Sequence, residues 1–319
     1  MQQEAAVHTG IQSTREPGAL ARWWKEIRHN RWAYVFISPF YILFAIFGLF
    51  PVGYSLYLSL HDWNGVRPME YVGLENYRYV FSERGDLFWT SVQNSAIIFL
   101  LYVPLMTFLA LVLAVLLNSG YIKGFRFFRT TMFMPYVTSM IAAGFVFQIM
   151  LGSHEGMVNT VLSDLGLPTV GWLDTIWGTR VSLAILVTWA WLGYNMIIML
   201  AGLQTISQDL TEAARVDGAN NVQAFFHITI PLLRPVILFS LVLSTSGTFN
   251  LFNEVVSIAA PDGFKGGTRY SILTPMILIY NTGFRHFEFG RASAEAYVYF
   301  VLIAALTFFQ FRYLGNRDK

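Results

Sequence analysis

Long apolar runs separated by polar segments dominate the pattern of hydrophobic and polar positions along the chain. Six runs are long enough to cross the hydrocarbon core of a bilayer as a helix, which takes about 20 apolar residues. They cover approximately residues 33–60, 92–117, 131–151, 181–203, 236–259 and 292–311. A further apolar stretch at 271–283 is too short to span, and we expect it to be a half-buried segment outside the bilayer. The pattern therefore predicts an all-α membrane protein with six transmembrane helices.

The placement of lysine and arginine predicts the orientation, because cytoplasmic segments carry an excess of both. With the N-terminus inside, the cytoplasmic segments hold 13 of the 21 lysines and arginines. Two compact basic clusters, at 22–31 and 123–129, directly flank apolar runs. We therefore expect both termini to lie in the cytoplasm.

Composition narrows the class of protein. The 319-residue chain is 55% hydrophobic and 13% charged, whereas ordinary soluble domains are about 45–50% apolar and about 25% charged. This leaves too little polar surface for a soluble enzyme, and the chain is too apolar for a disordered protein. The net charge of +2 is too small to indicate a nucleic-acid binder. The chain has no cysteine, which excludes disulfides, thiolate catalysis and cysteine zinc sites.

The segment 204–235 is about thirty residues long, more than a cytoplasmic connection between two spans needs. Its first half predicts a short helix through 211–217, with Ser207 or Asp209 as the N-terminal cap. Gly218 follows, and glycine suits the left-handed residue that ends a helix. This half of the loop is therefore expected to be one capped helix.

The second half of the loop predicts another helix, over about 221–228. Asn220 and Gln223 have the spacing of a capping box at its start. Pro231 and Pro235 are expected to stop this helix before the next span begins. Across the whole loop, small residues leave room for the backbone of another protein to approach closely: Ala213, Ala214, Gly218 and Ala219. The charged residues Glu212, Arg215 and Asp217 lie beside them. The residues alone therefore allow two interpretations, a docking surface for another protein or a solvated amphipathic hairpin on the membrane surface.

The run from Glu212 to Ala219 reads EAARVDGA and is followed by Pro231 and Pro235. It resembles the "EAA" loop of ABC-importer permeases, in which EAA is followed by Asp-Gly-Ala and then by a proline about a dozen residues beyond the glycine. Other segments are similar to the carbohydrate branch of these permeases, the maltose and glycerol-phosphate type: Tyr71-Val72-Gly73-Leu74-Glu75-Asn76-Tyr77, Phe88-Trp89 with Asn94, Arg129 with Met134-Pro135, and Trp191-Leu192-Gly193 before Leu203-Gln204. The resemblance covers about 35–315. The chain departs from the pattern by lacking a large extra external domain and extra N-terminal spans. It also has Thr205-Ile206-Ser207 where the family often has an Ile-Pro pair.

The resemblance implies a type I ABC importer permease fold and a multi-pass protein of the bacterial inner membrane. The implied function is import of a carbohydrate, an oligosaccharide or polyol, by alternating access. The chain has no G-x-x-x-x-G-K-[ST] motif, so ATP hydrolysis is assigned to a partner, and this chain is predicted to be neither an enzyme nor a holder of ATP, magnesium or another cofactor. The implied partners are a second permease subunit of a different chain, a dimeric ABC ATPase, an extracellular or periplasmic substrate-binding protein and membrane lipid, with no nucleic acid.

The expected division of the chain follows from these features. A basic cytoplasmic tail at 1–32 precedes the first transmembrane helix and an external segment at 33–91. The permease core follows at 92–312 with the coupling loop 204–235, and a cytoplasmic tail ends the chain at 313–319. In the loop, the resemblance assigns contact with the ATPase to Glu212, Ala213, Ala214, Arg215, Asp217 and Gly218.

A site for a sugar is expected where the fourth and fifth predicted spans carry polar and aromatic side chains. Amides and carboxylates hydrogen-bond sugar hydroxyls, and aromatic faces stack on sugar rings. From the residue types and the resemblance together, we expect nine residues to line the substrate pathway: Trp189, Leu192, Gly193, Tyr194, Asn195, Met196, Asn250, Asn253 and Glu254. The alternative role for the asparagines is to bridge helices, which is worth about 0.6 kcal/mol on average.

An ion-coupled secondary transporter and a membrane-embedded hydrolase are the two alternative functions for a membrane protein of this kind. An ion-coupled secondary transporter needs acidic groups or broken helices in the membrane. Only Glu254 offers such an acid, and the long cytoplasmic loop would have no role. A membrane-embedded hydrolase is disfavoured because His154-Glu155 lacks the second histidine of H-E-x-x-H, so no metal site is expected.

Overall fold

The computed structural model describes residues 23, 26–82, 85–119, 123–153, 156–259 and 262–315. The chain divides into two compact units, Met1–Ser55 and Leu56–Lys319. The tails predicted at 1–32 and 313–319 lie largely outside the described residues, and so does the His154-Glu155 pair.

The first unit is dominated by one long apolar helix. The α2 helix (Arg31–Phe44), a π-helical turn (η1, Ala45–Leu49) and α3 (Phe50–Leu58) follow one another without a break. Together they form a 28-residue helix that is long and apolar enough to span a membrane, as the pattern predicts for the first run. Its large apolar side chains are exposed, which suits contact with lipid or with another membrane subunit.

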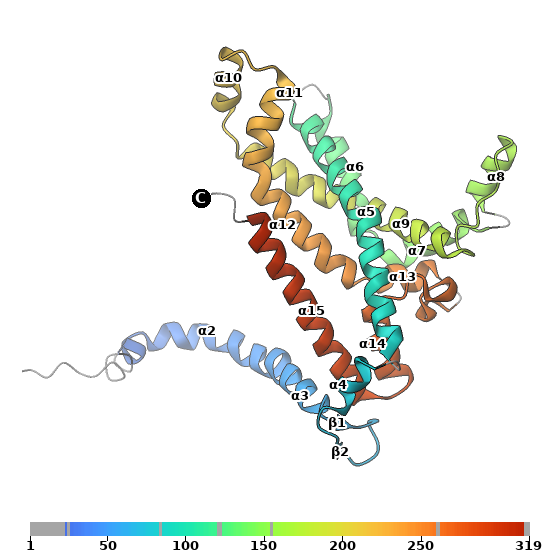
Figure 1. The fold of residues 1–319 in the computed structure, drawn as a ribbon. Helices are drawn as coiled ribbons and strands as arrows, with labels where there is room; N and C mark the ends of the chain where they lie inside the picture. The colour runs from blue at the N-terminus through green and yellow to red at the C-terminus, as the bar shows by residue number, and fades with distance from the viewer. Residues whose placement is uncertain are drawn as a thin grey trace, which may run out of the picture. The chain divides into compact units, whose positions relative to one another are not determined.

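The second unit is mostly helical (Figure 1). A short antiparallel pair comes first, in which His61 faces Tyr71 and Asp62 faces Glu70. In chain order its elements are β1 (His61–Asp62), β2 (Glu70–Tyr71), α4 (Glu75–Val80), α5 (Asp86–Asn118), α6 (Phe125–Val137), α7 (Met140–Met150), α8 (Met157–Asp164), α9 (Ile176–Gln204), α10 (Gln208–Val216), α11 (Asn221–Ala224), the π turn η3 (Phe225–Thr229), α12 (Ile230–Phe249), α13 (Asn253–Ile258), the 3₁₀ turns η4 (Gly263–Lys265) and η5 (Thr268–Tyr270), α14 (Pro275–Tyr280), the π turn η6 (Asn281–Arg285) and α15 (Phe289–Gly315).

Among the described residues, five helices are long and apolar enough to span, and a bent pair makes a sixth. The third predicted span, 131–151, is wrong as one continuous helix, because α6 and α7 meet at an angle of 94°. Thr138 is extended (φ −76°, ψ 147°), and the Ser139 hydroxyl accepts a hydrogen bond from the Ala142 amide at 3.5 Å as the N-terminal cap of α7. The cap starts a new helix inside an apolar run, which hydropathy alone does not reveal.

The fifth span is displaced from its predicted limits of 236–259. The helix runs from Val222 to Phe249, so Pro231 and Pro235 do not stop it as expected. Pro231 is the second residue of α12 and directly follows the π turn η3. In the π turn before it, the Ile230 amide bonds to the Phe225 carbonyl five residues back, so the helix widens and continues.

The core of this unit forms where α9 packs against α5, α6 and α12. Glycine makes two of these approaches possible. A Cβ built on Gly193 would lie 1.8 Å from the Met132 carbonyl oxygen of α6. A Cβ on Gly202 would lie 2.8 Å from Val236 and 2.9 Å from Leu233 of α12. Small residues that let backbones approach closely are typical of helix contacts in membranes.

The segment 271–283 is more buried than the half-buried arrangement expected. Ile272 and Leu273 are 0% and 2% exposed. The Asn94 side-chain amide of α5 donates to the carbonyl oxygens of Tyr270 (2.6 Å) and Leu273 (3.3 Å). These long-range hydrogen bonds hold the segment inside the unit. The local sequence around 271–283 does not predict them, because Asn94 is far away in the chain.

We predict that Gly193→Ala lowers the thermal stability of the purified chain in detergent, because the added methyl group must push α6 away from α9. Overpacking of this kind costs about 1–3 kcal/mol. The matched control is Gly247→Ala in α12, where a Cβ meets nothing within 4 Å. Equal melting temperatures for the two variants would contradict the close α6–α9 contact.

Candidate functional site

The loop between α9 and α12 begins as a capped helix, as the sequence predicts. The Ser207 hydroxyl accepts a hydrogen bond from the Asp209 amide (3.2 Å) and caps α10. At the other end, the Gly218 amide donates to the Arg215 carbonyl (3.0 Å). Gly218 has a φ of +89°, the left-handed conformation expected of it. The helix begins at Gln208, so Glu212 lies in its second turn.

The second half of the loop starts with the predicted capping box. The Asn220 amide donates to the Gln223 side-chain oxygen, and the Gln223 amide donates to the Asn220 side-chain oxygen, each at 2.8 Å. The helix that follows is α11, and it leads through η3 into α12 without interruption. The loop therefore forms a hairpin of two capped helices, α10 and α11, attached directly to a membrane-spanning helix (Figure 1).

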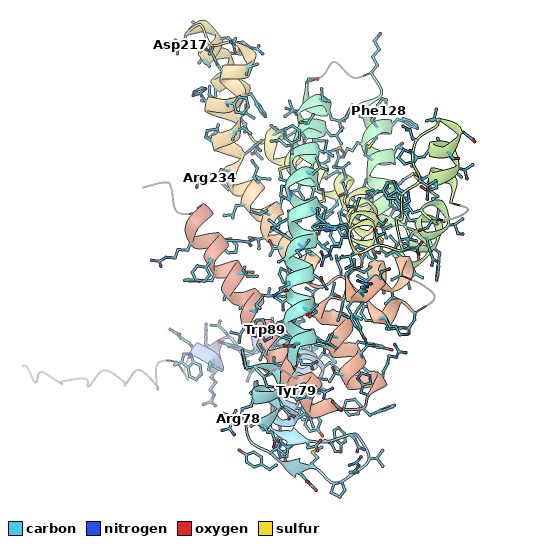
Figure 2. All side chains as sticks on the ribbon, turned by 45° about the vertical axis from the view of Figure 1, so that its right-hand side comes forward. Arg78, Tyr79, Trp89, Phe128, Asp217 and Arg234 are labelled. Atoms are coloured by element: carbon cyan, nitrogen blue, oxygen red, sulfur yellow. The ribbon has the colours of Figure 1, made fainter. Side chains whose placement is uncertain are left out.

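The hairpin presents its predicted coupling residues to its surroundings. Glu212, Ala213, Arg215, Asp217 and Gly218 are exposed, and Ala214 is half-buried. Figure 2 shows Asp217 at the tip of the hairpin, with Arg234 farther along α12. Large apolar side chains on and beside the hairpin are exposed as well: Leu210, Val216, Val222 and Phe226. Exposed apolar side chains grouped with charged ones are typical of a surface that binds another protein.

A second polar region lies where α12 ends. The Asn250 amide bonds to the Ser246 and Gly247 carbonyls (both 3.1 Å), and its side-chain amide donates to Ser246 (2.8 Å). Its side-chain oxygen accepts from the Tyr299 hydroxyl of α15 (3.3 Å). The chain turns through 250–252 before α13 begins at Asn253. The predicted pathway residues Asn250 and Asn253 are both exposed at this break rather than inside a continuous span.

Glu254 follows in α13 and is buried. Its helix packs against α9, where the Trp191 side chain lies close to the Glu254 carboxylate. Nearby, the Tyr102 hydroxyl of α5 and the Thr248 hydroxyl of α12 are 2.6 Å apart. The structure therefore brings a carboxylate of the break together with the aromatic stretch of α9, two regions that the sequence predicts to be neighbours.

Aromatic rings of α9 continue this region toward α6 and α7. Tyr194 stacks on Tyr136 with ring centres 4.5 Å apart, and Trp191 meets Tyr136 edge-on at 5.4 Å. Trp189 packs against Phe147 with ring centres 5.5 Å apart. Trp189 is partly exposed, and Leu192 and Tyr194 are half-buried.

The remaining nominated residues lie inside helix contacts in this conformation. The Asn195 side-chain oxygen accepts from the Ser240 hydroxyl of α12 (2.5 Å), and its amide donates to the Trp191 carbonyl (3.0 Å). Met196 is fully buried, and Gly193 is covered by the α6 backbone. Asn195 thus bridges α9 and α12, the alternative role that the sequence left open for the asparagines, while Gly193 and Met196 are packed inside helix contacts.

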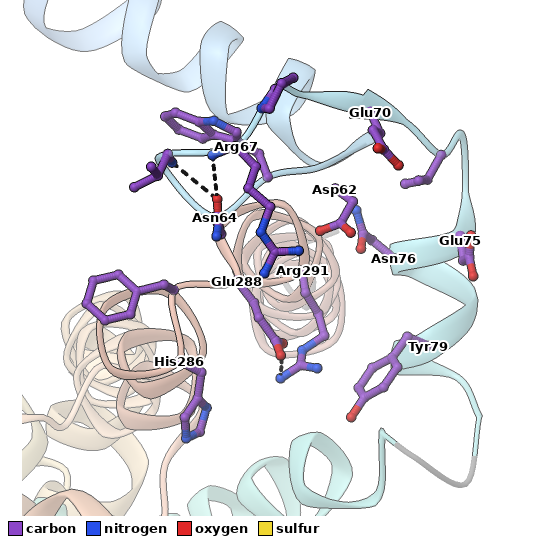
Figure 3. Close-up of a pocket in the computed structure, with 15 residues that line it drawn as sticks. Asp62, Asn64, Arg67, Glu70, Glu75, Asn76, Tyr79, His286, Glu288 and Arg291 are labelled. Carbon is purple, nitrogen blue, oxygen red and sulfur yellow. Dashed lines mark hydrogen bonds and ion pairs between the residues drawn. The ribbon is translucent and has the colours of Figure 1, made fainter.

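Sequence reasoning missed a large polar pocket at the other end of the unit (Figure 3). It has a volume of about 860 Å³ and lies between the β1–β2 pair, α4 and the start of α15. Its carboxylates, amides and aromatic rings come from two segments more than 200 residues apart in the chain. Proximity of that kind leaves no local signal in the sequence. In the described part of the chain, no group of three or more histidines, aspartates and glutamates is arranged to hold a metal ion.

Comparison with known proteins gives a family and a fold. The family model described as "Binding-protein-dependent transport system inner membrane component" matches residues 92–317. The lactose transport system permease protein LacF of Rhizobium radiobacter is 38% identical over 285 residues, which cover 88% of this chain and 93% of that protein. The arabinooligosaccharides transport system permease protein AraP of Halalkalibacterium halodurans is 33% identical over 290 residues, covering 90% and 88%.

Solved structures share the fold. A chain of a bacterial ABC transporter involved in the import of the acidic polysaccharide alginate superposes with a TM-score of 0.79 at 23% identity, covering 93% of this chain and 100% of that chain. A chain of the bacterial alginate transporter in complex with an alginate pentasaccharide-bound periplasmic protein gives a TM-score of 0.78 at 24% identity, covering 91% and 96%. The predicted helical importer fold is confirmed.

We predict that Asn195 and Ser240 are energetically coupled. Each single change to alanine removes the hydrogen bond between α9 and α12, so the double variant should cost less than the sum of the two single variants. The expected coupling is about 0.6 kcal/mol, measured by unfolding in mixed micelles. Strict additivity of the two changes would show that the bridge contributes nothing to stability.

Proposed function

The chain belongs to the family of binding-protein-dependent transport system inner membrane components, and from this premise we propose that it is the subunit through which an importer carries a carbohydrate, an oligosaccharide or polyol, across the membrane. The resemblance to ABC-importer permeases and the inner-membrane location are confirmed by this family match. The chain is a membrane subunit rather than an enzyme. The family match also decides against the ion-coupled secondary transporter and the membrane hydrolase.

The carbohydrate cargo is supported by the relatives. Permeases named for lactose and for arabinooligosaccharides match this chain over about nine-tenths of its length. The chemistry beside the α12–α13 break suits such a cargo, since exposed amides and nearby aromatic rings supply hydrogen bonds and stacking surfaces for sugar rings. Asn250 and Asn253 are the proposed contacts, and Glu254, the next residue of α13, is buried. The partly exposed Trp189 adds an aromatic face.

The observation that carries the proposal of an ATP-driven partner is the capped hairpin of α10 and α11. Its helices are closed by their own caps, its charged and apolar side chains are exposed, and a Cβ at Gly218 would meet nothing within 4 Å. A rigid, exposed hairpin joined to α12 is suited to receive a push from another protein. We assign that push to a dimeric ATPase, which binds ATP and magnesium outside this chain.

The assembly is completed by two further partners. A second permease subunit, a different chain, would enclose the pathway together with this one, and a substrate-binding protein would deliver the sugar from outside. The orientation with both termini in the cytoplasm places the hairpin on the ATPase side and the β1–β2 pair on the outer side. In this arrangement ATP-driven closure of the ATPase dimer opens the pathway outward, and hydrolysis returns it to the inward-facing state.

We predict that Gly218→Val and Glu212→Ala impair import in different ways. Valine at a φ of +89° is strained by roughly 1–2 kcal/mol and holds the ATPase surface away, so recovery of the complex should fall. Glu212→Ala removes a charge-assisted hydrogen bond to the ATPase, so the complex should form but uptake should no longer follow ATP hydrolysis. The measurements are co-purification, uptake and substrate-stimulated ATPase activity in proteoliposomes.

The controls match the local structure but lie outside the hairpin. Gly124→Val carries the same kind of strain at a φ of +78°, with open space around it, and Asp86→Ala removes an exposed acid from the first turn of another helix. Normal import by both hairpin variants would make the hairpin a passive surface feature.

We predict that Asn250→Ala combined with Asn253→Leu reduces sugar uptake by roughly five- to 150-fold, because about 1–3 kcal/mol of hydrogen bonding is lost. Co-purification with the ATPase should be unchanged, because the hairpin is untouched. Asn118→Ala, at the exposed end of α5, is the control. Wild-type uptake by the double variant would assign these amides a structural role.

A further inference from the structure

The polar pocket beside the β1–β2 pair has no role in the function proposed above. Its volume of about 860 Å³ lies in the upper part of the range of about 300–1,000 Å³ in which proteins hold small ligands. One wall comes from the chain between β1 and α4, and the other from the segment that leads into α15 (Figure 3). It is a different place from the helix break, and on the proposed orientation it opens to the outside.

The walls of the pocket are fixed by hydrogen bonds and by close packing. The Asn76 side-chain amide donates to the carbonyl oxygens of Ser59 and His61, each at 3.0 Å. The Phe289 amide donates to the Trp63 carbonyl at 3.0 Å, which joins the two walls. A Cβ on Gly290 would lie 1.9 Å from the His61 carbonyl oxygen, so α15 begins in direct contact with β1. The pocket is therefore preformed.

One pair of like charges in the pocket lining works against the stability of the strand pair that carries it. Asp62 and Glu70 face each other directly across the two strands, and like charges in that position destabilise a strand pair. On the opposite wall Glu288 forms an ion pair with Arg291, whose guanidinium lies 4.5 Å from the centre of the Tyr79 ring. An unfavourable carboxylate pair on a pocket wall indicates that these groups serve a ligand rather than the fold.

The chemistry of the lining selects the class of ligand. Carboxylates outnumber arginines, four to two: Asp62, Glu70, Glu75 and Glu288 against Arg67 and Arg291. Anionic ligands are disfavoured by that balance, whereas carboxylates and amides are good acceptors and partners for hydroxyl groups. Trp63, Tyr79 and Phe287 add aromatic rings to the same lining. A ligand with many hydroxyls, apolar ring faces and no charge meets all of these groups.

We propose that this pocket is a second carbohydrate site, which receives a short neutral oligosaccharide on the outer side before the sugar enters the membrane pathway. The proposal rests on the proposed function for the class of cargo and for the orientation. It adds a site with its own residues, so the two proposals can fail separately. Asp62, Glu70 and Asn76 hydrogen-bond the hydroxyls, and Trp63 and Phe287 face the rings.

The test uses the absence of cysteine from this chain. Val72→Cys places a thiol in the pocket lining, and Leu74→Cys places one on the same segment outside it, at a 61% exposed position. The rate of maleimide modification is measured on the assembled complex, without binding protein, in lactose, arabinotriose or an alginate trisaccharide. A neutral sugar at about ten times its dissociation constant should slow modification at Val72→Cys about tenfold, because the unliganded fraction falls by 1 + [L]/Kd. Leu74→Cys should react at an unchanged rate.

A variant separates sugar binding from blocked access. Glu70→Gln in the Val72→Cys background should weaken the protection several-fold, with protection taken as the ratio of that variant's own rates without and with sugar, because the lost carboxylate also changes the reactivity of the nearby thiol. Asp86→Asn should leave this ratio unchanged. Stronger protection by the anionic alginate trisaccharide than by the neutral sugars would overturn the proposal. Protection that appears only when the binding protein is added would also overturn it, because the pocket would then hold a part of that protein.

Uptake assays on the same complex, with its binding protein now added, distinguish the two proposals. Uptake of lactose or arabinotriose without protection at Val72→Cys overturns the pocket site and leaves the proposed function standing. Protection by a neutral sugar without uptake of any sugar supports the pocket site and overturns the proposed cargo.

Discussion

The close approach of α9 to the helices around it is the contact on which the rest of the second unit depends. Apolar surface alone does not hold helices together in a bilayer, where lipid is as apolar as leucine, so backbones must approach closely. Gly193 admits the backbone of α6, and Gly202 admits side chains of α12. The hydrogen bond between Asn195 of α9 and Ser240 of α12 adds a directional interaction to the contact between these two helices. These contacts seat α12 against α9.

The position of α12 connects the hairpin with the break before α13. This helix continues from the hairpin through a π turn and ends at Asn250, where the chain breaks before α13. A force applied to the hairpin therefore reaches the break along one continuous helix, without a flexible joint of loop residues. The polar side chains exposed at the break, together with Trp191 and the buried Glu254, are the groups that such a motion would rearrange.

Local chemistry made much of this predictable from sequence. The cap at Ser207, the left-handed Gly218 and the capping box at Asn220 depend on residues a few positions apart, and all three are confirmed. Hydropathy located the spanning segments, but it did not predict the 94° bend between α6 and α7 or the end of α12 at Phe249. Both features depend on the hydrogen-bond partners of individual backbone amides and carbonyls. The polar pocket was missed for a related reason, since its two walls are far apart in the sequence.

The central claim is that the hairpin docks on the ATPase and passes its motion to α12. The most direct test is the reactivity of a single cysteine at Val216, which is 88% exposed in this chain, with and without the bound ATPase. The account predicts that Val216→Cys reacts readily with a maleimide in the isolated subunit and is protected in the assembled complex. A cysteine at the 91% exposed Val66, on the side proposed to face outward, should react equally in both. Equal reactivity of Val216→Cys in the isolated and assembled states would contradict the account.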